Sequence, residues 1–180
     1  TFLLAALNSP LMWWHNWRTF IHLKDEALSP MAYMVETLPI AEPTAVIREA
    51  AEKAVRRLIE IAASQQQTQR TLLDWLRVEY GIEKPGNKLQ AAAELDSDTL
   101  VAEVKRIRGK KQPLTAAGVQ GLREEYTLTI EPARALAAEL LQLECALSGL
   151  VNQAYGLTPE EIELMWQTAP PRMPIPPPKA

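Results

Sequence analysis

The chain has 180 residues, 47% of them hydrophobic, and a net charge of -3, the composition of a globular protein long enough to bury a core. This charge excludes a protein that binds nucleic acid over its whole surface, so any DNA contact must come from local basic patches. The single cysteine, Cys145, excludes an intramolecular disulfide and a metal site built from cysteines.

No apolar run reaches the ~18 residues that cross a membrane, so we expect no membrane partner. The apolar opening, Phe2 to Leu7, lacks the charged segment and cleavage site of a signal peptide, so we expect a cytoplasmic protein. Because the chain begins directly in an apolar pattern, we expect a piece of a longer protein.

Residues 1–43 are predicted to be the end of a compact module. A short apolar helix over 2–8 is followed by one over 10–20, with Ser9 at its cap and Pro10 at its first position. Residues 33–38 are predicted as a short strand and 38–43 as an extended connector. Three tryptophans within five residues cannot all face one core, and they favour packing or an interface over base stacking: Trp13, Trp14 and Trp17.

Residues 44–79 are predicted to form one helix, roughly 50 Å long at ~1.5 Å per residue, which Gly81 ends. Its apolar positions recur in alternating steps of four and three and form a seam that needs a partner: Ile47, Ala51, Ala54, Leu58, Ile61, Leu72 and Trp75. Two seam positions, Gln65 and Thr68, are polar, and we interpret them as positions that set the register or allow close approach, not as a ligand site.

A second long helix is predicted over 132–155, opened by Glu131-Pro132. Its leucine-rich seam favours antiparallel pairing with the first long helix. Two short helices would pack across one end of this pair: one over 97–108, capped by Asp96 and Ser97, and one to 126, capped by Thr115. A capping box at Thr158 and Glu161 starts a last helix. The predicted fold is mainly α, with at most one short strand. The expected domains are a recognition-like module, a helical spacer and a proline-rich tail: 1–43, 44–168 and 169–180.

The sequence contains no glycine-rich phosphate loop, no nucleophile elbow and no metal-ligand pattern, so we expect no catalytic residue, metal or cofactor here. The strongest charge signal is five bases in seven residues, which either form a solvated helix end or contact phosphates. With two bases of the tryptophan-rich region, these are the candidate DNA-binding residues: Lys105, Arg106, Arg108, Lys110, Lys111, Arg18 and Lys24. The proline tail would dock on a partner, form an unattached terminus or lie along its own domain.

Four stretches carry a resemblance to one family. Residues 3–11 (LLAALNSPL) and 38–43 (LPIAEP) resemble the end of a target-recognition domain and its exit into a spacer helix. These features occur in type I specificity subunits and fused type II enzymes of restriction–modification systems. Residues 73–82 (LDWLRVEYGI) and 151–161 (VNQAYGLTPEE) are similar to C-terminal regions of large N6-adenine DNA methyltransferases.

The resemblance implies a non-catalytic C-terminal part that supports recognition of duplex DNA and sets the spacing of the recognition domain. Catalysis, S-adenosylmethionine binding and any endonuclease activity would lie upstream, because the family's catalytic tetrapeptide is absent from this chain. The partners would be DNA and an upstream methyltransferase domain or another subunit. The alternative is a helical protein–protein interaction or dimerisation module without DNA contact.

Overall fold

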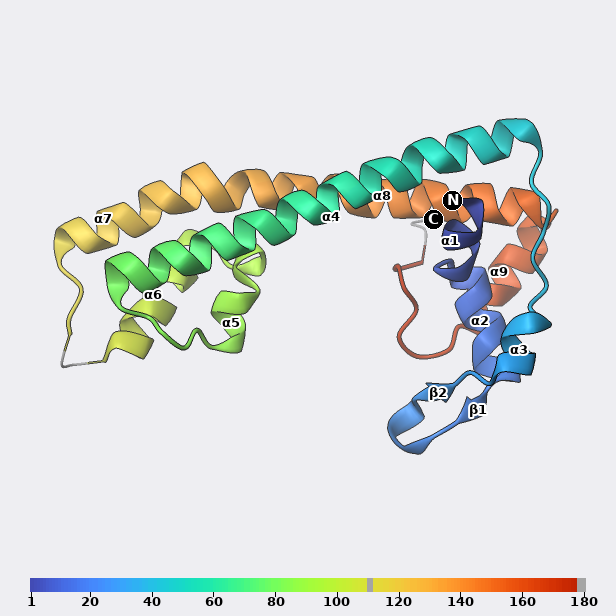
Figure 1. Ribbon diagram of the computed structural model, residues 1–180, viewed down its shortest axis with the longest axis horizontal. Coiled ribbons are helices and arrows are strands. Elements are labelled where there is room, and N and C mark those ends of the chain that lie inside the picture. The colour runs from blue at the N-terminus through green and yellow to red at the C-terminus, as the bar shows by residue number, and fades with distance from the viewer. Residues whose placement is uncertain (110–111, 178–180) are drawn as a thin grey trace. The chain divides into compact units, whose positions relative to one another are not determined.

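A computed structural model describes residues 1–109 and 112–177 of the chain (Figure 1). The fold is mainly α, as predicted. The chain divides into two compact units, of which unit 1 consists of Thr1–Leu58 with Leu141–Ala180 and unit 2 of Ile59–Leu140. The predicted domains were consecutive segments with boundaries at 44 and 168, whereas unit 1 combines the two ends of the chain. The predicted domains stay a prediction.

Two long helices supply residues to both units: α4, Ala45–Tyr80, and α8, Glu131–Ala154. The 36 residues of α4 contain neither glycine nor proline, and at 1.5 Å per residue they rise about 54 Å. The Thr44 hydroxyl accepts a hydrogen bond from the Ile47 amide at the start of α4 (3.4 Å). Gly81, with φ of 65°, ends it, so the predicted helix is confirmed nearly to the residue.

Unit 1 places the beginning of α4 against the end of α8. One buried cluster contains Ala51 and Val55 of α4 together with Leu147 and Val151 of α8, closed by the first helix of the chain. In unit 2, Leu72 near the end of α4 shares a core with Ile130, directly before α8. The two helices therefore run antiparallel, and the small residues of the α4 seam leave room for α8 leucines.

The remaining elements of unit 1 are α1 (Phe2–Leu7), α2 (Pro10–Thr19), β1 (Ile21–His22), η1 (Lys24–Glu26), β2 (Leu28–Ser29), α3 (Ala32–Glu36) and α9 (Pro159–Gln167). The strand predicted over 33–38 is wrong, because α3 occupies this segment. The described residues instead form two strands, a hairpin in which Ile21 pairs with Ser29 and His22 with Leu28. Val35 and Thr37 favour strand locally, but a strand needs a neighbour with which to bond.

Unit 2 adds α5 (Asn87–Gln90), η2 (Ala92–Glu94), α6 (Ser97–Arg108), α7 (Ala116–Glu125) and the π-turn η3 (Tyr126–Ile130). Asp96 caps α6 by accepting from the Thr99 amide (2.7 Å), and Thr115 caps α7 by accepting from the Gly118 amide (3.1 Å). Aliphatic residues from α4, α6 and α7 fill the core with two tyrosines.

The helix predicted to open at Glu131-Pro132 instead continues directly from α7 through η3 into α8. Pro132 has no amide hydrogen, and in a regular helix its ring would clash with the carbonyl of Leu128. The π-turn before it widens the backbone and relieves that clash. A proline that suggested a helix start therefore marks a change of helical pitch.

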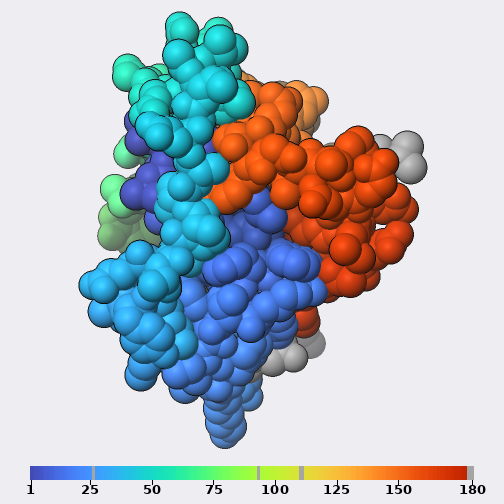
Figure 2. All heavy atoms as spheres, turned by 90° about the vertical axis from the view of Figure 1, so that its right-hand side faces the viewer, coloured from blue at the N-terminus to red at the C-terminus, as the bar shows by residue number. Residues whose placement is uncertain are grey.

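The C-terminal segment lies along unit 1. The predicted capping box of α9 is present, since the Thr158 amide donates to the Glu161 carboxylate (2.8 Å) and the Glu161 amide to the Thr158 hydroxyl (3.3 Å). The indole of Trp13 donates to the Pro171 carbonyl (3.0 Å) and that of Trp14 to the Thr168 hydroxyl (2.9 Å). Figure 2 shows blue N-terminal residues of unit 1 beside the orange-red C-terminal part of the chain. The tail therefore packs on its own domain.

Candidate nucleic-acid interface

The candidate DNA-binding residues belong to different parts of the chain. Arg18 and Lys24 lie in unit 1, whereas the other described candidates belong to unit 2 and form the last turn of α6. Those three are Lys105, Arg106 and Arg108. The remaining two, Lys110 and Lys111, lie outside the described residues.

Arg108 points toward the end of α4. Its Nη1 donates to the carbonyl of Tyr80 (2.7 Å), the last residue of that helix, and its Nε donates to the carbonyl of Gln112 (3.0 Å). Its guanidinium also lies 5.7 Å from the centre of the Tyr80 ring. Arg108 thus satisfies a helix-terminal carbonyl of α4 and links two elements of the unit, a use that leaves it fewer donors for DNA.

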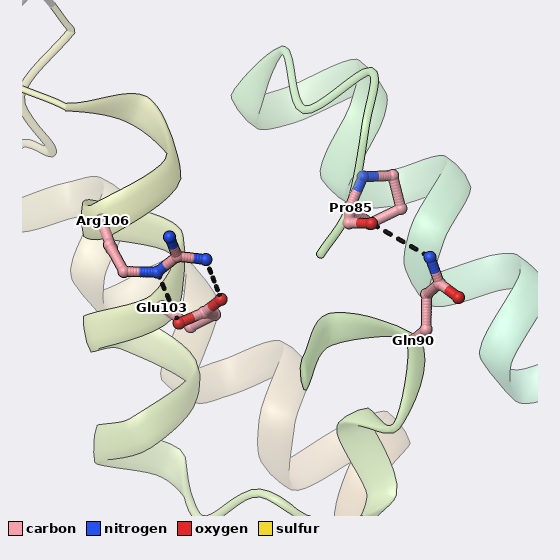
Figure 3. Close-up of polar contacts among 4 residues, drawn as sticks. All are labelled: Pro85, Gln90, Glu103 and Arg106. Atoms are coloured by element: carbon pink, nitrogen blue, oxygen red, sulfur yellow. Dashed lines mark hydrogen bonds and ion pairs between the residues drawn. The ribbon is translucent and has the colours of Figure 1, made fainter. Parts of the chain in front are cut away.

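Arg106 forms a two-point ion pair with Glu103, one turn earlier on α6 (Figure 3). Its Nε lies 3.0 Å from Oε2 and its Nη2 lies 2.5 Å from Oε1. The hydrogen bonds from Arg106 hold the pKa of Glu103 below its usual value, and the same bonds raise the pKa of Arg106. Both groups are therefore charged at neutral pH.

The burial of this pair is unequal. The Glu103 side chain is 5% exposed and that of Arg106 is 66% exposed. The loop before α5 covers the pair closely, since a Cβ on Gly86 would lie 3.6 Å from Arg106 Nη2 and 3.7 Å from Glu103 Oε1. The Gln90 side chain secures this loop by donating to the Pro85 carbonyl (3.1 Å; Figure 3). Exposed Lys105 precedes Arg106, and we call Lys105 and Arg106 the α6 patch.

Arg18 in unit 1 is engaged within the fold. Its two terminal nitrogens donate to the carbonyls of Trp14 (3.0 Å) and Thr168 (2.8 Å), and its guanidinium stacks 3.9 Å above the Trp14 ring. The third tryptophan of α2, Trp17, packs against the His22 ring with centroids 4.6 Å apart. Lys24 is exposed in η1. Arg18 and the three tryptophans thus make contacts inside unit 1, consistent with the packing interpretation of the aromatic cluster.

A concave site also lies in unit 2, where polar residues of α4 face alanines of α8. The cavity has a volume of about 570 Å³ and is lined mainly by Gln65, Gln66, Thr68, Gln69, Gln90, Ala133 and Ala137. The Gln69 amide donates to the Leu89 carbonyl (3.0 Å). Sequence reasoning missed this groove: the polar seam positions were a local signal, but the alanines that face them come from a distant part of the chain.

Sequence reasoning also missed Glu103, for which the spacing of three residues from Arg106 was a signal. Among residues 1–109 and 112–177, no three metal-binding side chains cluster at one place. The described helices include none that combines the length and the apolar character required to span a bilayer.

Comparison with curated proteins and with solved structures found no match. A family model described as a domain of unknown function, DUF8810, matches residues 44–151, from the residue before α4 to the last turn of α8. This stretch includes all of unit 2 and the α6 patch, and it is more than half of the chain. The chain therefore belongs to the DUF8810 family.

Proposed function

We propose that this chain is the non-catalytic C-terminal part of a DNA restriction–modification methyltransferase, in which it supports DNA target recognition and spaces the recognition domain. The observation that carries the DNA contact is the α6 patch, where two adjacent cationic side chains are exposed on a capped helix. Such contacts to phosphates position a protein on DNA without reading its sequence.

The arrangement of the elements supports the resemblance to restriction–modification methyltransferases, from which we infer the parent protein. Residues 38–44 form no helix or strand and run straight into α4 (Figure 1), as the exit from a recognition domain into a spacer helix would. Of the two other similar stretches, 73–82 contains Gly81, where α4 ends, and 151–161 leads through Gly156 to the cap of α9. Both stretches therefore include helix boundaries.

The proposal has consequences for partners. Duplex DNA is the ligand, and an upstream methyltransferase domain or another subunit provides catalysis and binds S-adenosylmethionine. No cofactor belongs to this part of the protein. We place the assembly in the cytoplasm, where a restriction–modification enzyme meets DNA.

The test is fluorescence anisotropy of the chain with a labelled duplex over a series of salt concentrations. Each phosphate contact contributes about 0.9 to the slope of log affinity against log salt. Neutralising both patch residues in Lys105→Ala/Arg106→Ala should therefore lower the slope by almost two. Arg77→Ala is the matched control, because Arg77 is an exposed arginine of α4 paired with Asp74. Equal slopes for the patch variant and the unaltered chain would refute the patch.

The alternative function, a dimerisation module, is favoured by a different observation. Apolar side chains are exposed along the hairpin and α3, with Tyr33 at 56% exposure: Ile21, Leu23, Met31, Tyr33 and Val35. Apolar side chains exposed together are typical of interfaces. Size-exclusion chromatography with light scattering distinguishes the two functions. A stable dimer that Tyr33→Ser/Val35→Ser dissociates, and that DNA leaves unchanged, would support the alternative.

A further inference from the structure

The Glu103–Arg106 pair differs from an ordinary surface ion pair in where its two partners lie. Most surface pairs expose both side chains and order neither of them strongly. Here the carboxylate is buried while the guanidinium remains largely exposed. Residues three apart lie on the same face of a helix, and Figure 3 shows the two side chains pointing toward one another from α6.

The pair leaves Arg106 with outward donors in a fixed orientation. Both carboxylate oxygens are taken by Nε and Nη2, which fixes the plane of the guanidinium. Nη1 points away from the carboxylate in Figure 3, and its two hydrogens can bind an external acceptor. A free arginine would have to lose rotamer freedom when it binds, whereas this one is already ordered.

The surroundings of Glu103 favour a role in orienting the Arg106 guanidinium over a role that only neutralises its charge. The loop at Gly86 packs over the pair, so the carboxylate is sheltered from water and its hydrogen bonds to Arg106 are strengthened. Lys88 also lies close enough to lower the pKa of Glu103. Exposed Lys105 adds a second positive charge next to Arg106 on the same helix.

We infer that Glu103 is a positioning residue that holds Arg106 aligned to donate hydrogen bonds to a backbone phosphate of duplex DNA. This inference rests on the proposed function and adds to it an acidic residue whose negative charge would ordinarily oppose DNA binding. Arginine suits this use because its planar fork can bind a carboxylate on one edge and a phosphate on another.

The direction in which Glu103→Gln changes the affinity for DNA distinguishes a positioning role from a purely electrostatic one. Glu103→Gln removes a negative charge, so an unspecific electrostatic patch would bind DNA more tightly in this variant. If Glu103 positions Arg106, the same variant binds more weakly, by about tenfold, the order of one hydrogen bond to a charged group. In an Arg106→Ala background, Glu103→Gln should cause no further weakening, because the group it orients is absent.

The experiment measures the affinity of the full chain for a labelled duplex at fixed salt, with circular dichroism to verify folding. Glu83→Gln is the control, since Glu83 is an exposed glutamate of the neighbouring loop; its affinity should stay equal or rise slightly. Glu103→Asp keeps the charge but shortens the reach, so it should weaken binding. Arg106→Lys keeps the charge but cannot span both carboxylate oxygens, so it should also weaken binding, by less than Arg106→Ala.

The outcomes are distinct. If the unaltered chain binds DNA and Glu103→Gln binds as tightly or more tightly, this inference is overturned while the proposed function stands. Full affinity in Arg106→Lys overturns it as well, even where a Glu103 variant fails to fold. If the unaltered chain shows no salt-dependent binding, both the proposed function and the inference fall.

Discussion

Two glycines near the end of α8 have opposite roles. Gly156 has φ of 65° and stops the helix, whereas Gly149 lies inside it, where an added Cβ would meet no atom within 4 Å. We expect Gly156→Ala to lower the free energy of unfolding by about 1 kcal/mol, because an L side chain strains a left-handed backbone. Gly149→Ala should raise it by ~0.5–1 kcal/mol through helix propensity. Urea unfolding of both variants measures this, and shifts of the same sign would contradict the assignment.

The carboxyl groups of the chain respond to pH in two opposite ways. Hydrogen bonds lower the pKa of Asp96, Glu103 and Glu160, with Thr99, Arg106 and the start of α9 as the respective donors. A lowered pKa in the folded state stabilises the fold above the ordinary pKa, and this gain is lost as the pH falls through the lowered value. Burial raises the pKa of Glu144, so its charged form costs stability at neutral pH.

The two classes should separate in thermal unfolding measured from pH 7 to pH 3. Glu103→Gln should be less stable than the unaltered chain at pH 7, and the difference should shrink below about pH 4.5, where the carboxyl is protonated in the unfolded chain. Glu144→Gln should be more stable at pH 7, with a difference that also shrinks on acidification. A Glu144→Gln variant destabilised at pH 7 would show that its carboxylate has a partner.

At the scale of elements, helix ends with local signals were predictable. Ser9, Asp96, Thr115 and Thr158 each cap the helix that the sequence assigned to them, because a cap involves residues only two or three positions apart. The hairpin was not predicted, since its pairing joins segments with weak strand character. The π-turn before Pro132 was missed for a related reason, because one proline fits a helix start and a widened helix equally well.

Two indole hydrogen bonds connect the C-terminal tail to α2, and substitution of the two tryptophans tests them. If the two indole hydrogen bonds hold it to α2, Trp13→Phe/Trp14→Phe should release it with little change in the core. At ~0.5–1.5 kcal/mol for each bond, we expect tryptic cleavage after Arg172 to be several-fold faster. Mass spectrometry of a time course measures the rate. Trp166→Phe in α9 is the control, and equal acceleration in this control would contradict the role of the two bonds.

At the scale of the molecule, the sequence located the run of bases at the end of α6 but did not show how each base is used. Arg106 is exposed as expected, whereas Arg108 bonds to Tyr80, 28 residues earlier in the chain. No local pattern connects Arg108 with Tyr80. The sequence therefore could not show which bases of the run bond within the fold and which remain exposed. The groove beside Gln65 was hidden for the same reason, because its alanines come from α8.

The order in which the chain is synthesised gives the two units different folding histories. Unit 2 is one uninterrupted segment, Ile59–Leu140, so all its core residues leave the ribosome together. Unit 1 cannot complete its core until Leu147 and Val151 emerge, although Phe2 and Ala5 appear first. At about 5–20 residues per second, the first helices wait roughly 7–30 seconds for Leu147 with apolar side chains uncovered. Pulsed hydrogen exchange on stalled nascent chains should therefore find unit 2 protected first, and chaperones should bind the N-terminal segment during that interval.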